Sequence, residues 1–323
     1  MSDSASRPKA VVFGCAGLRL SDDERRFFEA AEPLGFILFA RNVETPEQVA
    51  GLVAELRHCV GRDDAPILID QEGGRVQRLG PPHWRASPTA RSFAELARTD
   101  IDAACQAARL NARQIADDLS TLGITVNCAP VLDVPAADGH EIIGDRALGD
   151  DPATVAALGR AVCEGLLAGG VLPVIKHLPG HGRAVSDSHL ELPVVVADLI
   201  ALREIDFAPF KSLNDMPWAM TAHVVYSALD GDNPATLSAE VIGRTIRGDI
   251  GFDGLLISDD LSMKALAGDF GDRARAALAA GCDVVLHCNG DPDEMTAVAD
   301  AVGGLSVAAT ARVAAAERLR LAA

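Results

Sequence analysis

Short apolar runs alternate along the chain with longer stretches in which apolar residues recur at helical spacing. The short runs are continuously apolar, which is typical of parallel strands that are covered by helices. Strands are predicted at residues 10–13, 35–39, 66–69, 124–127, 172–175, 219–222, 255–258 and 283–286. Helices are predicted between most of them, at about 21–33, 46–60, 101–122, 152–169, 198–213, 238–248, 262–280 and 292–302.

Eight strands that alternate with helices over about 300 residues predict a (β/α)8 barrel of the TIM type. A doubly wound parallel sheet is the alternative arrangement of the same elements. Three of the helices have start signals, because Ser21, Thr45 and Asp151 can each cap the residues that follow. We see no linker or repeat that would divide the chain. We therefore predict a single domain over residues 1–323, with a barrel core at about 10–303 and a last helix at about 305–323.

Composition restricts the class of partner. The chain has 323 residues, of which 49% are hydrophobic, and this is enough apolar mass for a large core. Its net charge of -17 argues against binding to nucleic acid or to an anionic membrane surface. An aromatic content of only 4% argues against a surface that stacks bases. A small-molecule substrate is the remaining expectation.

The expected location is the cytoplasm. The first nine residues lack the basic region and apolar core of a secretory signal, and no apolar run approaches about 18 residues. The seven cysteines are scattered, odd in number and without a CxxC pair, which indicates reduced thiols.

A barrel also predicts where function lies, because catalytic side chains of such barrels gather at the carboxyl ends of the strands. Polar residues follow seven of the eight predicted strands. They are Arg41-Asn42, Asp70 to Arg75, Asn127 with Asp133, Lys176-His177, His223, Asp259-Asp260 and His287.

The segment from Lys176 to His189 is the richest in titratable groups. Asp187 and His189 are two residues apart, so an extended loop places both side chains on one side. A carboxylate beside an imidazole fixes its tautomer and raises its pKa, which suits a proton donor near neutral pH. A pair that only stabilises the loop is the alternative. Because Gly180 and Gly182 precede this pair, we hypothesise that the loop moves when sugar binds.

Two residues at the start of that segment, Lys176 and His177, end a predicted strand. The ammonium of Lys176 offers three donors to hydroxyls or to an anion, and an ion pair with a carboxylate such as Asp70 is the alternative. His181 is expected to be a hydrogen-bonding loop residue. A metal site is only weakly indicated, since no HExxH or HxH pattern occurs; its candidate ligands would be His177, His181, Asp187, His189 and His223.

The predicted strand at 255–258 delivers Asp259 to the mouth of the barrel. A carboxylate there can be a nucleophile, a general base or a metal ligand, and a helix N-cap is the alternative. Adjacent strand residues point to opposite sides, so Asp259 and Asp260 are not both expected to face the pocket. We expect Asp260 to cap the helix predicted at 262–280.

Several of these segments resemble the family 3 glycoside hydrolases, and within that family the short bacterial β-N-acetylhexosaminidases of peptidoglycan recycling. The resemblance runs from about residue 11 to 290. The segments that carry it are 35–42, 70–78, 143–146, 175–182, 187–189, 220–223, 234–238 and 258–263. The combination of Lys-His with Asp-x-His is specific to this branch, because other members use a distant glutamate as the acid/base.

The resemblance implies a role for each matching residue. It implies that Asp259 is the nucleophile that forms a covalent glycosyl-enzyme, and that His189 is the general acid/base with Asp187 as its dyad partner. It also implies which residues hold the N-acetylglucosamine ring, namely Asp70, Arg78, Arg146, Lys176 and His177. These roles agree with a retaining glycosidase that uses a histidine in place of the second carboxylate.

The expected activity is that of a retaining exo-β-N-acetylglucosaminidase. The expected substrates are peptidoglycan fragments such as N-acetylglucosaminyl-1,6-anhydro-N-acetylmuramic acid and its peptide forms. We expect no metal, no organic cofactor and a monomer. The alternatives are a β-glucosidase or β-xylosidase of the same family, a metal-dependent hydrolase, and a sugar-binding protein without catalysis. The last would require the loss of Asp259 or His189, and both are present.

Overall fold

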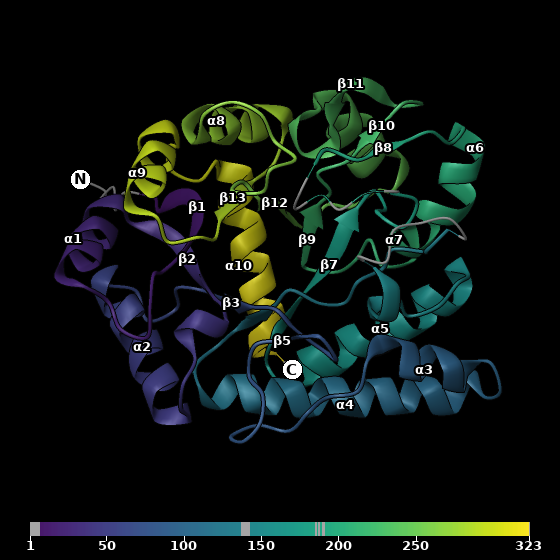
Figure 1. The fold of residues 1–323 in the computed structure, drawn as a ribbon, viewed down its shortest axis with the longest axis horizontal. Helices are drawn as coiled ribbons and strands as arrows, with labels where there is room; N and C mark the ends of the chain where they lie inside the picture. Colours follow the sequence, from purple (N-terminus) through teal and green to yellow (C-terminus); the bar gives the residue numbers. More distant parts are fainter. Residues whose placement is uncertain (1–6, 137–142, 185, 187, 189–190, 323) are drawn as a thin grey trace.

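The computed structural model describes residues 7–136, 143–184, 186, 188 and 191–322. Eight parallel strands close into a barrel in the order β1-β13-β12-β9-β7-β6-β3-β2 (Figure 1). Their bounds are β1 Lys9–Gly14, β2 Pro33–Leu38, β3 Ile67–Ile69, β6 Val126–Asn127, β7 Leu172–Leu178, β9 Trp218–Thr221, β12 Leu255–Asp260 and β13 Val284–His287. Each of these coincides with a predicted strand, so the (β/α)8 barrel is confirmed.

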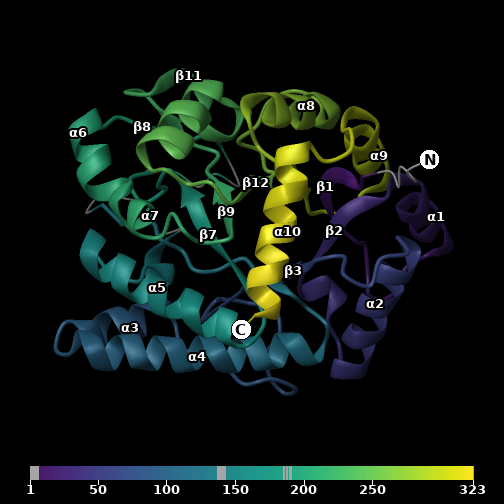
Figure 2. The same cartoon turned by 180° about the vertical axis from the view of Figure 1, so that it is seen from behind.

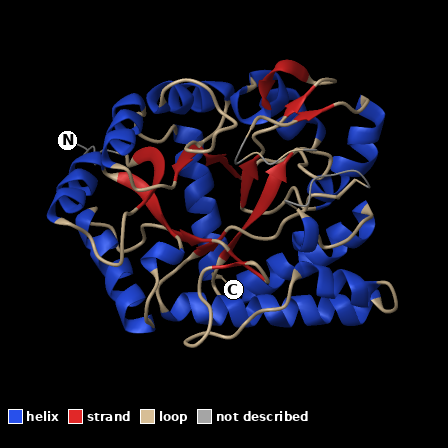
Figure 3. Ribbon diagram, viewed as in Figure 1, coloured by secondary structure: helices blue, strands red, loops and turns tan. Residues whose placement is uncertain are grey.

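Helices surround the barrel (Figure 3). They are α1 Asp22–Ala31, α2 Pro46–Cys59, α3 Ala90–Ala97, α4 Ile101–Thr121, α5 Pro152–Ala168, α6 Leu199–Ala201, α7 Ala208–Ser212, α8 Phe270–Ala280, α9 Pro292–Ala301 and α10 Val307–Leu321. The predicted caps are confirmed, since the side chains of Ser21, Thr45 and Asp151 accept hydrogen bonds from the first turns of α1, α2 and α5. Within the described part of the chain, no helix is both long and apolar enough to cross a membrane.

The last helix closes one end of the barrel. Figure 2 shows α10 running across the barrel on the side away from the viewer of Figure 1. Ala309 and Ala316 of α10 pack in the same apolar cluster as Leu34 and Trp218, which lie near the amino ends of their strands. The amino end of the barrel is therefore filled, and the carboxyl end remains for a site.

Alternate residues of each strand belong to two different cores. On β1, Val12 belongs to the cluster inside the barrel, whereas Val11 and Phe13 pack between the barrel and the helices. On β13, Leu286 faces inward by the same alternation. Along these strands, only every second apolar residue therefore faces the inside of the barrel.

Three helix predictions need correction. Residues 198–213 do not form one continuous helix but three consecutive elements, namely α6, the π-helical turn η3 (Leu202–Asp206) and α7. The helix predicted at 238–248 is a second π-helix, η5 (Val241–Asp249). The helix predicted at 262–280 begins only at Phe270, with Asp269 as its N-cap. Residues 261–266 instead form turns and bends, and four of them are buried apolar residues. These are Leu261, Met263, Ala265 and Leu266.

Small elements missed by the sequence follow the carboxyl ends of the strands. A hairpin of β4 (Gln71–Gly73) and β5 (Val76–Gln77) follows β3 directly. A three-stranded sheet joins β8 (Val194–Val195), β10 (Val225–Tyr226) and β11 (Asp230–Pro234). The single turns η1 (Ala40–Asn42), η2 (Gly144–Arg146) and η4 (Ala235–Leu237) complete this rim. These elements have too few residues to show a periodicity in the sequence.

Candidate active site

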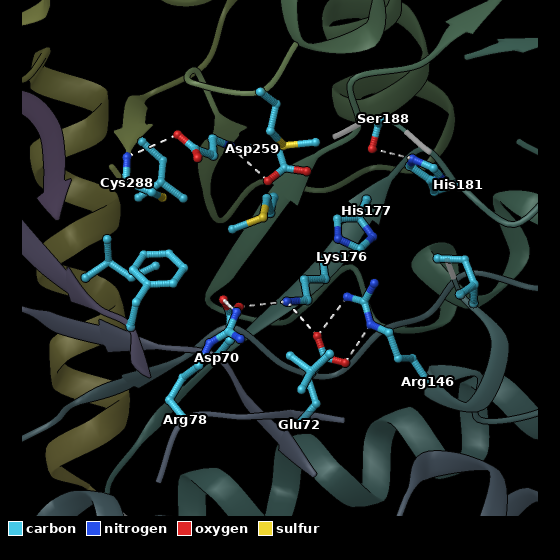
Figure 4. Close-up of a pocket in the computed structure, with 18 of the residues that line it drawn as sticks. Asp70, Glu72, Arg78, Arg146, Lys176, His177, His181, Ser188, Asp259 and Cys288 are labelled. Carbon is cyan, nitrogen blue, oxygen red and sulfur yellow. Dashed lines mark hydrogen bonds and ion pairs between the residues drawn. The ribbon is translucent and has the colours of Figure 1, made fainter. Parts of the chain in front are cut away.

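A cavity of about 180 Å³ lies at the carboxyl end of the barrel (Figure 4). Six of the eight predicted site residues line it, and they come from segments that are far apart in the sequence. The six are Asp70, Arg78, Arg146, Lys176, His177 and Asp259. The other two, Asp187 and His189, lie outside the described residues, so the acid/base dyad remains a prediction.

One wall of the cavity is a row of alternating charges. Arg78 Nη2 donates to Asp70 Oδ2 at 2.9 Å, and Lys176 Nζ lies 3.0 Å from Asp70 Oδ1. The same Nζ lies 2.9 Å from Glu72 Oε1, and Glu72 in turn receives Arg146. Figure 4 shows these five side chains side by side along the lower wall. The ion pair of Lys176 with Asp70, which the sequence offered as the alternative to a binding role, is present, and Glu72 is a second partner that the sequence did not predict.

These charges persist at neutral pH. Burial alone would raise the pKa of Asp70 and of Glu72, but Lys176 and the neighbouring arginines outweigh it. The pKa of Asp70 is held well below its ordinary range, and that of Glu72 is lowered to about 2. Burial would lower the pKa of Lys176, but the two carboxylates raise it above its ordinary value. The wall therefore offers fixed donors and acceptors to the hydroxyls of a ligand.

A buried carboxylate, Asp133, organises the next part of the cavity. It accepts the Nδ1 hydrogen of His177 at 2.7 Å and the backbone N–H groups of His177 at 3.2 Å and His181 at 2.6 Å. Burial would raise the pKa of Asp133, but the two histidines and these hydrogen bonds lower it to about 2. Because Nδ1 of His177 faces a carboxylate, Nε2 is the ring atom that can meet a ligand.

His181 is a hydrogen-bonding loop residue, as predicted. Its Nε2 lies 3.0 Å from the hydroxyl oxygen of Ser188, and both side chains are buried. Burial lowers the pKa of His181 to about 4, so the ring is neutral at neutral pH. In the sequence Ser188 stands between Asp187 and His189, and it lines the cavity itself.

The two glycines of this segment have a packing role. A Cβ on Gly182 would lie 1.9 Å from the carbonyl oxygen of Val134, and one on Gly180 would lie 2.9 Å from Cβ of Asp206. Gly180 also has a φ of +138°, which side chains rarely adopt. Both positions require glycine because the neighbouring residues Val134 and Asp206 lie too close for a side chain. The two glycines therefore give no support to the hypothesis of a moving loop.

Asp259 is the last but one residue of β12 and faces the cavity, and the backbone N–H of Asp260 donates to its Oδ1 at 2.8 Å. The prediction that only one of the two aspartates faces the cavity is wrong, because both line it. Asp260 is not a helix cap. Its carboxylate accepts the backbone N–H groups of Ser262 at 2.9 Å and Cys288 at 3.1 Å, and these bonds draw it toward β13.

Two other strand-end residues, His223 and His287, have structural positions. His223 is fully buried and bonds Thr236 Oγ1 through Nδ1 at 2.7 Å and the carbonyl oxygen of Asp260 through Nε2 at 3.0 Å. His287 packs edge-on against Phe13 and Phe270, outside the barrel. Neither lines the cavity.

The described residues contain no group of three or more histidines, cysteines or acidic residues placed to hold a metal ion. Of the predicted metal ligands in this part of the chain, His177 and His181 are bonded to Asp133 and Ser188, and His223 uses both ring nitrogens.

Comparison with known proteins agrees with this geometry. The family model described as the glycosyl hydrolase family 3 N-terminal domain matches residues 11–321. The β-hexosaminidase of Bordetella avium is 38% identical over 286 residues, which cover 87% of this chain and 81% of that protein.

Two solved structures are also similar. The family 3 β-N-acetylglucosaminidase of Paenibacillus sp. has a TM-score of 0.88 and 34% identity over 97% of this chain, which spans 61% of that larger protein. NagZ from Neisseria gonorrhoeae, solved in complex with N-trifluoroacetyl-D-glucosamine, has a TM-score of 0.84 and 33% identity, and the match covers 98% of this chain and 99% of that one.

Proposed function

The chain belongs to glycosyl hydrolase family 3 and is a β-N-acetylhexosaminidase, and we propose that it removes terminal β-linked N-acetylglucosamine from peptidoglycan fragments with retention of configuration. N-acetylglucosaminyl-1,6-anhydro-N-acetylmuramic acid and its peptide forms are the proposed substrates, and the cytoplasm is the proposed location. One observation carries the proposal: a carboxylate at a strand end, Asp259, shares a cavity with a wall of fixed charges suited to sugar hydroxyls.

The charged wall of the cavity binds the sugar in this proposal. The carboxylate of Asp70 can accept hydroxyl hydrogens, while Arg78, Lys176 and Arg146 donate to hydroxyl and acetamido oxygens. His177 adds a further polar atom through Nε2. Because the ion pairs among these groups fix their positions before sugar arrives, little ordering is needed on binding. The N-acylated glucosamine bound to the similar Neisseria gonorrhoeae protein supports an amino sugar as the ligand.

The first chemical step is assigned to Asp259. Its carboxylate oxygen attacks the anomeric carbon, and the bond between that carbon and the leaving oxygen breaks. His189 gives a proton to the leaving oxygen. In the second step water attacks the anomeric carbon and gives a proton to His189, and Asp259 leaves as a carboxylate. Asp187 would keep the imidazole in the tautomer that serves both steps.

Trapping of the covalent intermediate tests this proposal. A 5-fluoro-N-acetylglucosaminyl fluoride should form a long-lived ester, and peptide mass analysis should find the added sugar on Asp259. Asp259→Ala should lose both the label and nearly all turnover, whereas Asp260→Asn should still carry the label on Asp259. A label on any other residue would overturn the assignment.

The choice of sugar needs a separate measurement. Matched aryl N-acetylglucosaminide and aryl glucoside substrates should differ strongly in kcat/KM, with the amino sugar preferred. A preference for the glucoside would instead support a β-glucosidase of the same family. Full activity after exhaustive chelation would eliminate a metal-dependent hydrolase.

A further inference from the structure

A buried ion pair fastens the segment that precedes the predicted acid/base residues. Arg183 Nε lies 2.6 Å from Oδ2 of Asp206, the last residue of the π-helical turn η3. The side chain of Asp206 is 1% exposed, whereas that of Arg183 is 23% exposed. Neither residue lines the cavity with the charged wall. The pair therefore joins the chain just after β7 to the helical layer outside the barrel.

The buried carboxylate of Asp206 is costly to keep. Its Oδ1 is buried and has no hydrogen-bond partner among the described residues. Burial raises the pKa of Asp206 to about 6 in spite of the bond to Arg183. A buried carboxylate with one unsatisfied oxygen is a poor way to stabilise a fold. A role in holding the segment around Arg183 accounts for it better.

Other contacts also hold residues 180–183 in place. Tyr226, itself fully buried, donates its hydroxyl hydrogen to the carbonyl oxygen of Gly180 at 2.7 Å. The carbonyl oxygen of Gly182 accepts the backbone N–H of Ala136 at 3.0 Å. Gly180 packs so closely on Asp206 that a Cβ there would lie 2.9 Å from Cβ of Asp206. Asp206 thus contacts the segment at both Gly180 and Arg183.

From this fastened segment a short path leads to the predicted proton donor. His181 lies between Gly180 and Arg183 in the chain, and its Nε2 is 3.0 Å from the hydroxyl oxygen of Ser188. Ser188 is covalently adjacent to His189. A shift of residues 180–183 would therefore be passed to Ser188 through this hydrogen bond.

We propose that Asp206 is a positioning residue for proton transfer, which acts through Arg183 and the His181–Ser188 hydrogen bond on the segment that carries His189. The inference rests on the proposed function, in which His189 is the acid/base. It predicts that loss of Asp206 damages protonation of the leaving oxygen more than it damages binding of the sugar or attack by Asp259.

The leaving group provides the test. Asp206→Asn keeps the shape of the side chain and removes its charge. For a substrate with a poor leaving group, such as the phenyl glycoside, kcat/KM should fall at least 10-fold, since general acid catalysis contributes about 10²–10⁴-fold. For the 2,4-dinitrophenyl glycoside, which needs no proton, kcat/KM should change less than about 3-fold. The ratio kcat/KM is used because it excludes the second step, which needs the base.

Two further variants keep the test decisive. Arg183→Gln removes the other partner from a partly exposed position and should give the same pattern if Asp206→Asn fails to fold. Asp283→Asn is the matched control: Asp283 is similarly buried and pairs with Arg247 and Arg312, and it directly precedes β13, at the opposite end of the barrel. This control should unfold more easily but leave the ratio between the two substrates unchanged.

The outcomes separate this inference from the proposed function. His189→Ala should itself be far more harmful with the phenyl glycoside than with the dinitrophenyl glycoside. If it is, and Asp206→Asn and Arg183→Gln lower kcat/KM equally for both substrates or not at all, the positioning role is overturned. If His189→Ala affects both substrates equally, the acid/base assignment itself fails.

Discussion

The guanidinium of Arg146 meets the carboxylate of Glu72 through two parallel contacts, Nε to Oε2 at 2.9 Å and Nη2 to Oε1 at 2.8 Å. Both side chains are almost completely buried. Glu72 also receives the ammonium of Lys176 at 2.9 Å. One carboxylate therefore sets the position of two of the cations that are proposed to hold the sugar.

Glu72→Gln should weaken sugar binding more than it slows the chemistry. The amide nitrogen cannot accept a hydrogen bond, so Arg146 or Lys176 loses a contact to residue 72, and the negative charge between the two cations is removed. We expect KM for an aryl N-acetylglucosaminide to rise on the order of 10-fold, with a smaller change in kcat. Steady-state kinetics measures both. Glu164→Gln, at an exposed pair with Arg109, is the control and should leave KM unchanged. An unaltered KM in Glu72→Gln would contradict the role.

Acid should destabilise the protein in a window that is set by its buried carboxylates. Opposite charges hold the pKa of Glu72 at about 2, below its ordinary value of 4.5, so the folded state binds fewer protons than the unfolded state between these values. This contribution is on the order of 3 kcal/mol, is fully present above about pH 4.5, and is lost as the pH falls toward 2. Urea unfolding at a series of pH values measures it. The decline should be shallower in Glu72→Gln, and equal slopes would speak against the shifted pKa.

Asp133→Asn should impair the enzyme for both good and poor leaving groups. Asp133 accepts three N–H groups from His177 and His181, and an amide nitrogen in its place would face one of them without a lone pair. His177 would also lose the charge that fixes its tautomer. We expect kcat/KM to fall at least 10-fold with the dinitrophenyl glycoside, because His177 is displaced, and to fall further with the phenyl glycoside, because His181 is displaced as well. An unchanged kcat/KM for the dinitrophenyl glycoside would contradict a role of His177 in sugar binding.

Much of the fold is readable from the sequence, because it depends on local patterns. Continuous apolar runs marked all eight barrel strands, and side chains such as Thr45 and Asp151 marked the starts of helices. Some failures come from elements too short to show a periodicity, and one comes from competition by a distant contact. Asp260 does not cap a helix, because its carboxylate accepts the backbone N–H of Cys288, the residue that follows the neighbouring strand β13.

The residues of the site also differ in how well the sequence predicts them. Strand-end position and resemblance together identified Asp70, Lys176 and Asp259, which do line the cavity. Glu72 follows Asp70 by two residues, and this spacing was a signal that both carboxylates could lie on one side. Asp133 was marked only by its position after a predicted strand, and nothing indicated its partners, which are 44 and 48 residues away. Residues that hold other site residues in place are therefore the hardest to predict from one sequence.

Gly182→Ala should disrupt the site although the change is a single methyl group. The added Cβ would lie 1.9 Å from the carbonyl oxygen of Val134, so the backbone must separate there and strain the hydrogen bond between Gly182 and Ala136. We expect a loss of stability of about 1–3 kcal/mol and a clear fall in kcat/KM. Thermal unfolding and kinetics measure the two effects. Gly51→Ala is the matched control, because Gly51 lies exposed within α2 with no atom within 4 Å of its added Cβ. That substitution should raise stability by about 0.5–1 kcal/mol and leave activity unchanged. If Gly182→Ala behaved like Gly51→Ala, the close approach to Val134 would not restrain the segment that leads to the predicted acid/base.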